Sequence, residues 1–115
     1  MANNKKLLPG STSMLLLRLL EDKDMYGYEM IEELEKRSKN TFSLKAGTLY
    51  PLLHDLEKKE LINSYTESAD NSRVRKYYTI TNKGKGMLKE KKEEWNSYSF
   101  AINQILQGGA GFAAI

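Results

Sequence analysis

Apolar residues recur at helical spacing in three stretches of the first half of the chain. The first stretch, residues 14–20, is apolar on almost every side and follows Pro9 and a Ser-Thr-Ser run, which are common where helices begin. The second and third stretches, residues 26–38 and 46–59, alternate an apolar face with a charged face. The pattern predicts three helices, with Pro51 near the beginning of the third, where its missing N–H costs the helix little.

The expected core comes from the apolar faces of these helices. A helix that is apolar almost all round, like the first, belongs in the core or against a second subunit. The other two helices bury one face each, and the residues expected there are Tyr26, Met30, Ile31 and Leu34 in the second helix and Leu49, Leu52, Leu53 and Leu56 in the third.

From residue 61 the pattern changes from helical to alternating. Residues 62–66 and 73–80 are rich in β-branched and aromatic side chains, and Asp70, Asn71 and Ser72 between them favour a turn. These features predict a two-stranded antiparallel hairpin. Because an isolated hairpin is only marginally stable in water, we expect it to lie against the helices with its far end projecting.

A last helix is expected over residues 82–107. Thr81 precedes it as a cap, and Gly108 and Gly109 are expected to end it. Its apolar residues follow a spacing of coiled-coil type, and one small domain cannot bury them all, which indicates an interface with another chain. This stripe consists of Leu88, Trp95, Tyr98, Ile102 and Ile105.

Composition narrows the class of protein. The 115 residues are 40% hydrophobic and 29% charged, as in one folded, soluble domain. No apolar run is long enough to span a bilayer and no secretory signal is recognisable, so we expect no membrane association and a cytoplasmic location. The net charge of +3 is compatible with binding to nucleic acid or to an anionic membrane, and by itself it does not distinguish these two partners.

Few residues could carry catalysis. The chain has no cysteine, a single histidine (His54) and no acidic cluster at metal-ligand spacing. No pairing of a nucleophile with a base and no cofactor fingerprint is recognisable. We therefore expect no catalytic residues, no metal and no cofactor, and an enzyme is the least favoured class.

Three helices followed by a charged hairpin is the order of a winged helix-turn-helix, an α+β fold that is mainly helical. In this fold the third helix enters the major groove of DNA and the hairpin, or wing, contacts the flanking backbone. The charged residues fit that division, because lysine and arginine neutralise phosphates while polar and aromatic side chains reach base edges. The expected surface comprises Lys45, Tyr50, His54 and Lys58 on the third helix and Arg73, Arg75 and Lys76 on the wing.

Three motifs resemble the PadR family of transcriptional regulators. They are Tyr-Gly-Tyr-Glu at residues 26–29, Gly-Thr-Leu-Tyr-Pro-Leu-Leu-His at 47–54 and Tyr-Tyr-Thr-Ile-Thr-Asn-Lys-Gly at 77–84. The second motif, followed by Leu-Glu at 56–57, is specific in that setting, and the resemblance spans most of the chain. The short length and single C-terminal helix resemble the compact branch of the family, which includes multidrug-responsive members.

The resemblance implies a homodimeric repressor that binds inverted-repeat operators in double-stranded DNA and releases them on binding a small molecule. By position it assigns Lys45, Thr48 and Tyr50 to recognition-helix contacts. Trp95 is similar to a tryptophan that faces its symmetry mate across a flat pore, where planar aromatic effectors stack. The implied organisation is a winged-helix DNA-binding part at 1–80, a dimerisation helix at 81–107 and a Gly/Ala tail at 108–115, whose role the sequence does not indicate.

Two residues depart from the family pattern. Asp55 stands where arginine or lysine is usual, and its charge would repel a nearby phosphate. Either Asp55 faces an internal lysine, or the contact with the operator differs from the common one. Glu60 stands where a glycine usually ends the third helix, which makes that turn less permissive without forbidding it. Neither the operator, the regulated genes nor the effector can be deduced from the sequence.

Each candidate residue also has a purely structural interpretation. Tyr50 could be a packed aromatic, His54 a solvated side chain and the wing cations an ordinary solvated strand. Trp95 and Tyr98 could be interface core with no ligand. A second hypothesis for the whole chain is a winged-helix interaction module with little or no specific DNA binding, and Asp55 is the residue that favours it.

Overall fold

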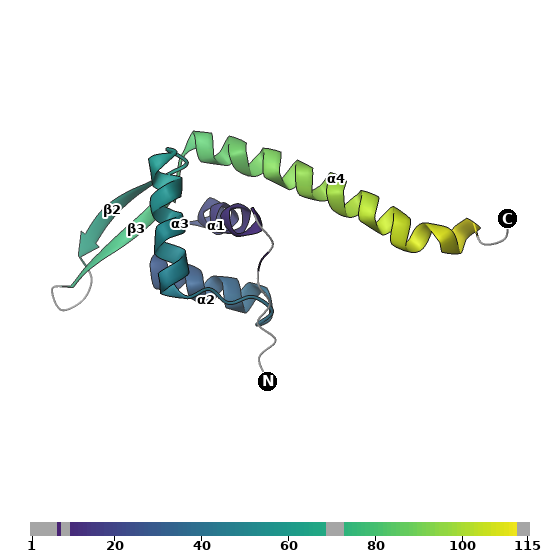
Figure 1. The fold of residues 1–115 in the computed structure, drawn as a ribbon. Helices are drawn as coiled ribbons and strands as arrows, with labels where there is room; N and C mark the ends of the chain where they lie inside the picture. Colours follow the sequence, from purple (N-terminus) through teal and green to yellow (C-terminus); the bar gives the residue numbers. More distant parts are fainter. Residues whose placement is uncertain (1–6, 8–9, 69–72, 113–115) are drawn as a thin grey trace.

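The computed structural model of the chain describes residues 7, 10–68 and 73–112. Within these residues a bundle of three helices lies beside a small antiparallel sheet, and a fourth helix leaves this body (Figure 1). The mainly helical winged-helix fold expected from the sequence is confirmed. The elements are α1 (Ser11–Asp22), β1 (Met25–Tyr26), α2 (Gly27–Arg37), α3 (Ala46–Lys58), β2 (Ile62–Ser68), β3 (Val74–Ile80) and α4 (Asn82–Phe112).

The core is built mainly from leucine side chains of α1, α2 and α3. Helix α1 buries four leucines, Leu16, Leu17, Leu19 and Leu20, as its nearly continuous apolar sequence predicts. Three residues expected in the core, Tyr26, Ile31 and Leu52, are only half-buried, and Ile31 and Leu52 pack at its edge. The other buried apolar residues are Met25, Met30, Leu34, Leu49, Leu53, Leu56, Leu61, Ile62, Tyr78 and Leu88.

The sheet has three strands in the order β1-β3-β2, so the expectation of two strands was incomplete. The added strand, β1, pairs Met25 with Tyr78 and Tyr26 with Tyr77 of β3. The sequence pattern had assigned Tyr26 to the second helix, but the helix begins at Gly27. A strand of two residues carries no readable alternation, which is why periodicity alone misses it. The expected turn residues Asp70, Asn71 and Ser72 lie outside the described residues.

The end of α3 forms a tight turn around Glu60. Its backbone is left-handed, with φ of 64°. The Glu60 N–H donates to the Glu57 carbonyl at 2.9 Å, and the Leu61 N–H donates to the Leu56 carbonyl at 3.0 Å. These two bonds and the buried Leu56 and Leu61 define a Schellman motif, in which glycine is usual. The turn therefore forms with glutamate in a conformation that costs a non-glycine residue free energy.

Thr81 caps the beginning of α4, as the sequence predicts. Its hydroxyl accepts the Gly84 N–H at 2.9 Å and donates to the Glu60 carbonyl at 2.8 Å. Gly84 is buried, and a Cβ at this position would overlap the Leu61 carbonyl oxygen and lie 2.8 Å from Cγ1 of Ile80. The glycine thus allows the first turn of α4 to lie directly on the end of α3 and the beginning of β2.

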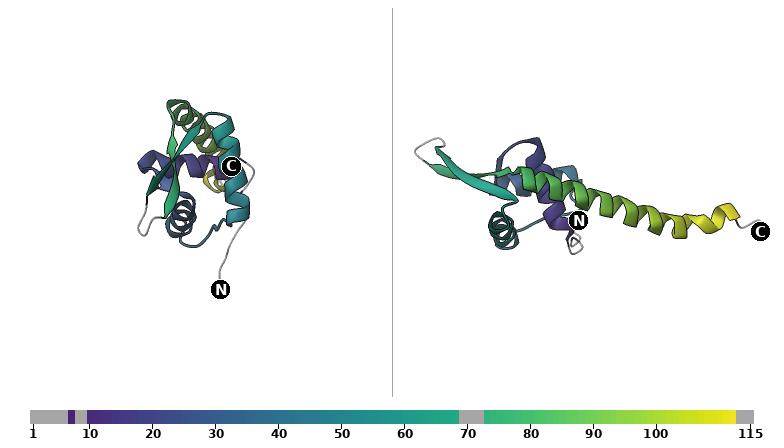
Figure 2. Two further views of the ribbon diagram at one scale, coloured as in Figure 1. Left: turned by 90° about the vertical axis from the view of Figure 1, so that its left-hand side faces the viewer. Right: turned by 90° about the horizontal axis from the view of Figure 1, so that it is seen from above.

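Helix α4 is longer than expected and extends far beyond the body of the molecule (Figure 2). The expected end at Gly108 and Gly109 was wrong, because the helix continues to Phe112. Glycine commonly ends a helix by adopting a left-handed conformation, and Gly108 has no such φ. The chain measures 70 × 37 × 21 Å with a radius of gyration of 17.6 Å, against about 13 Å for a compact chain of this length. Among the described helices none has a stretch that is both long and apolar enough to cross a membrane.

Candidate nucleic-acid interface

Helix α3 turns one face to the core and the other to solvent. Leu49, Leu53 and Leu56 are buried, whereas the predicted contact residues lie on other sides of the helix. Pro51 is the sixth helical residue and is exposed. Proline has no backbone N–H, so α3 lacks one helical hydrogen bond, on its solvent side. The exposed residues of this helix and its cap include Lys45, Thr48, Tyr50, His54 and Lys58.

Tyr50 lies on the flank of α3 and contacts the beginning of α2. A Cβ built on Gly27 would overlap the Tyr50 hydroxyl and lie 2.6 Å from Cζ of its ring. The tyrosine remains 40% exposed, and burial of part of the ring, followed by the nearby Tyr28, raises the pKa of its hydroxyl. Two of the sequence motifs therefore meet here, because the glycine of one makes room for the tyrosine of the other.

The wing places its cations next to Tyr50. Arg73, Arg75 and Lys76 are exposed, and they line one groove of about 570 Å³ together with Tyr50 and the beginning of α2. Lys45, Thr48 and His54 do not line this groove. None of its described lining residues is acidic, so the groove is an attractive site for an anion such as a phosphate. The full lining is Tyr26, Gly27, Tyr28, Tyr50, Arg73, Val74, Arg75 and Lys76.

A column of aromatic rings fixes the wing against β1. The Arg75 guanidinium lies 4.4 Å from the centroid of the Tyr26 ring. Tyr26 meets Tyr77 edge-on, with centroids 5.5 Å apart, and Tyr77 stacks on Tyr65 at 5.8 Å. Each contact joins two different strands, so the column ties Arg75 of β3 to Tyr26, the residue that directly precedes α2.

The column ends in a hydrogen bond between the wing and the loop before β1. The Tyr65 hydroxyl donates to Oδ2 of Asp24 at 2.6 Å. This hydrogen bond, with smaller effects of desolvation and of the Asp24 charge, raises the pKa of Tyr65 to about 12. The Asp24 carboxylate thereby accepts a hydrogen bond from a side chain of the wing.

Ion pairs hold α1 against α2 below this surface. Asp22 accepts from Arg18 at 2.7 Å and pairs with Arg37 of α2 at 2.8 Å. The hydrogen bond from Arg18, and then that from Arg37, lowers the pKa of the Asp22 carboxyl. Because these groups are largely exposed, they orient the helices more than they stabilise the fold.

The distal part of α4 carries a second candidate surface. Of the predicted stripe, Leu88 is buried in the core of its own chain at 1% exposure, which separates it from the other members. Trp95, Tyr98, Ile102 and Ile105 are 43%, 59%, 39% and 78% exposed. The stripe therefore consists of one residue, Leu88, that the body covers, and a distal part, from Trp95 to Ile105, that the described residues of this chain leave largely exposed.

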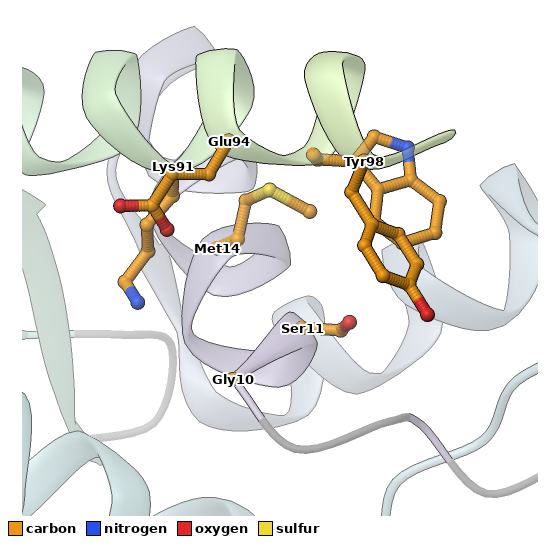
Figure 3. Close-up of a pocket in the computed structure, with 7 residues that line it drawn as sticks. Gly10, Ser11, Met14, Lys91, Glu94 and Tyr98 are labelled. Atoms are coloured by element: carbon orange, nitrogen blue, oxygen red, sulfur yellow. The ribbon is translucent and has the colours of Figure 1, made fainter. Parts of the chain in front are cut away.

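Trp95 and Tyr98 also line an open cavity of about 520 Å³ between α4 and α1. Figure 3 shows Lys91, Glu94 and Tyr98 on α4 above Met14 and Ser11 of α1. The ring centroids of Trp95 and Tyr98 are 6.1 Å apart, so the cavity offers two adjacent aromatic faces. Such a surface can stack on a flat apolar molecule.

Comparison with known proteins identifies the fold and the family. Residues 16–90 match the family described as "Transcriptional regulator PadR-like family". The chain belongs to the PadR family. An uncharacterised protein of Lysinibacillus sphaericus is 38% identical over 102 residues, which cover 89% of this chain and 94% of the relative.

Solved structures of PadR-like regulators superpose on most of this chain. A PadR family regulator from Clostridium difficile is 41% identical with a TM-score of 0.72, and covers 84% of this chain and 99% of its own. A PadR-like regulator from Bacillus cereus is 32% identical with a TM-score of 0.77, and covers 90% and 98%. The chain is therefore a transcriptional regulator of the PadR family, and the expectation that it is not an enzyme agrees with this membership.

The structure shows what the Asp55 side chain contacts. This residue favoured the hypothesis of an interaction module with little or no specific DNA binding. Asp55 Oδ2 lies 2.9 Å from Nζ of Lys59, the residue that caps the C-terminal end of α3. Of the two possibilities for Asp55, the structure therefore shows pairing with a lysine of its own chain. Both side chains are more than half exposed, so the pair adds little stability.

The sequence did not indicate that Tyr26 and Tyr28 line the groove between Tyr50 and the wing cations. Both line it, and Tyr28 is 61% exposed. The available signal was their position on either side of Gly27 in the first motif, but the helical pattern placed Tyr26 in the core. Among the described residues, no group of histidine and acidic side chains could hold a metal ion.

Proposed function

We propose that this PadR protein is a homodimeric repressor that binds an inverted-repeat operator and releases it when a small molecule binds between the subunits. The observation that carries the proposal is the groove in which Tyr50 of α3 meets three wing cations. In a winged helix these two elements face DNA together, α3 in the major groove and the wing on the flanking backbone.

The two sides of this groove would have different tasks on DNA. Arg73, Arg75 and Lys76 carry three positive charges that attract phosphates irrespective of base sequence. Tyr50, Lys45, Thr48 and His54 present polar groups along an exposed helix, where hydrogen bonds to base edges discriminate between sequences. Affinity would thus depend mainly on the wing and specificity mainly on α3.

The exposed distal stripe of α4 supports a second copy of the chain as its partner. Trp95, Tyr98 and Ile105 are large side chains left in water by this chain alone. A dimer closed by these residues would carry two copies of α3, and half-sites about 34 Å apart would suit one turn of DNA. Its site of action would be the cytoplasm, the location expected of a regulator that binds operator DNA.

The cavity beside Trp95 supports release by a planar aromatic effector. A ligand stacked on Trp95 and Tyr98 would lie between α1 and α4, the helices that join the body to the proposed interface. It would shift DNA affinity only if it bound the DNA-competent and DNA-free arrangements with different affinities. Titration of the protein–DNA complex with planar aromatic dyes, followed by release of DNA, tests this part.

Two sets of substitutions test the DNA-binding part. Replacing Arg73 and Arg75 by alanine should weaken binding to operator and scrambled DNA alike and reduce the slope of log K against log salt by about 2. Tyr50→Ala should instead reduce the discrimination between the two DNAs. Lys85→Ala with Lys89→Ala on α4 is a control that removes the same charge outside the groove. Equal loss of discrimination in the wing and Tyr50 variants would contradict the division of tasks.

The exposed α4 stripe also favours the second candidate, an interaction module whose partner is a different protein. Sedimentation velocity separates the two candidates. A stable dimer of this chain supports the repressor, whereas a monomer with the stripe still exposed supports the module.

A further inference from the structure

Gly47 is a glycine for which the fold itself gives no reason. It lies in the first turn of α3, is exposed, and has no left-handed φ. A Cβ at this position would meet no atom within 4 Å. Glycine is among the least favourable residues in a helix, so alanine would suit the isolated chain better.

Two other helical glycines, Gly27 and Gly84, are required by close packing within the chain. At Gly27 a Cβ would overlap the Tyr50 hydroxyl, and at Gly84 it would overlap the Leu61 carbonyl. Gly86 in α4, like Gly47, has open space around it and is exposed. Gly47 and Gly86 therefore form a matched pair, equal in free space and different in position.

The position of Gly47 separates it from Gly86. It is followed at i+4 and i+7 by Pro51 and His54, both exposed, so the three lie on the solvent side of α3. Neither Gly47 nor Pro51 presents a long side chain, so at these two positions the backbone of α3 lies close to the molecular surface. In a helix that enters the major groove, the N-terminal residues contact the base edges.

We propose that Gly47 is a specificity-determining position, at which the absence of a side chain lets the first turn of α3 approach the base edges closely. The inference rests on the proposed DNA-binding function. Glycine is the residue that permits close approach of a backbone to a ligand, and no part of the described chain uses the space beside Gly47. A methyl group there would hold α3 away from its preferred sequence.

The test begins with a duplex selected by the wild-type protein from a random-sequence DNA pool. Gly47→Ala and Gly86→Ala are then compared with wild type on that duplex and on a scrambled one. Both variants should melt at the wild-type temperature or a few degrees above it. Gly47→Ala should lose about tenfold or more in affinity for the selected duplex and less than about threefold for the scrambled one, whereas Gly86→Ala should change neither.

The outcomes separate this inference from the proposed function. If Gly47→Ala binds the selected duplex as tightly as wild type, Gly47 has no part in specificity while DNA binding stands. A lower melting temperature for Gly47→Ala would show that the glycine serves the fold, which also overturns the inference. If the pool yields no preferred sequence, the proposed function fails and this inference fails with it.

Discussion

The body of the molecule and the distal part of α4 use the same kinds of apolar residue in opposite ways. In the body, the core side chains of α1 to α3, among them Leu16, Met30 and Leu53, are between 0% and 4% exposed. Along distal α4, the apolar side chains from Trp95 to Leu106 are between 39% and 78% exposed. The body therefore satisfies its hydrophobic pattern within one chain, and distal α4 does not.

This difference teaches what periodicity can and cannot reveal. A stripe of apolar residues predicts that a helix has a partner, but it does not say whether the partner lies in the same chain. Leu88 and Trp95 belong to one stripe, yet the body covers only the first of them.

The largest expected effect is a loss of stability when the hydrophobic core of the body is disrupted. Leu53 is fully buried, so Leu53→Ala should lower the free energy of unfolding by about 2–5 kcal/mol through lost burial and a residual cavity. Urea denaturation followed by circular dichroism measures this loss. His54→Ala, at the exposed neighbouring position, is the control and should change the value by less than about 0.5 kcal/mol.

The next effect concerns assembly through distal α4. Ile105→Asp places a charge on the exposed apolar stripe and should raise the dimer dissociation constant about 100-fold, or about 2.7 kcal/mol, measured by analytical ultracentrifugation. Asn96→Asp introduces the same charge beside Lys92 and Glu93, on a polar side of α4 away from the stripe, and should leave the constant near its wild-type value. Equal effects of the two substitutions would contradict an interface on the stripe.

A smaller effect is expected from removing the backbone strain at Glu60, in the turn that follows α3. Glu60 has a φ of 64°, so Glu60→Gly should raise the free energy of unfolding by about 1 kcal/mol. The hydrogen bonds of this turn come from the backbone and remain in the variant. Glu60→Ala keeps the strain and should bring no such gain. A loss of stability in Glu60→Gly would show that the glutamate side chain has a role of its own.

The smallest effect concerns the hydrogen bond between Tyr65 and Asp24. The folded-state pKa of Tyr65 is raised to about 12, so its contribution to stability is present below pH 10 and is lost as the pH rises through 12. A pH titration by NMR with labelled tyrosine rings measures this pKa. Asp24→Asn should return it towards 10, and no movement would mean that the hydrogen bond is absent in solution.

Most of the fold could be predicted from the sequence because its elements carry strong local signals. The helical spacing of apolar residues located α1, α2 and α3, and the Thr81 cap located the beginning of α4. The short strand β1 could not be found, since two residues have no period. The end of α4 was placed too early because glycine can continue a helix as well as end it.

The candidate site could be predicted only in part. The exposed side of α3 and the wing cations followed from spacing and charge. The groove that joins them depends on the Tyr50–Gly27 contact, which brings together residues far apart in the chain. The pairing of Asp55 with Lys59 was one of two alternatives, and only side-chain geometry decided between them.

Binding of the purified wild-type protein to DNA, followed by fluorescence anisotropy across a salt series, tests the central claim most directly. The duplex selected from the random pool is compared with a scrambled duplex of the same composition. We expect tighter binding to the selected duplex at every salt concentration, with affinity that falls steeply as salt rises. Equal and weak binding to both duplexes would contradict a specific DNA-binding regulator and favour the interaction module.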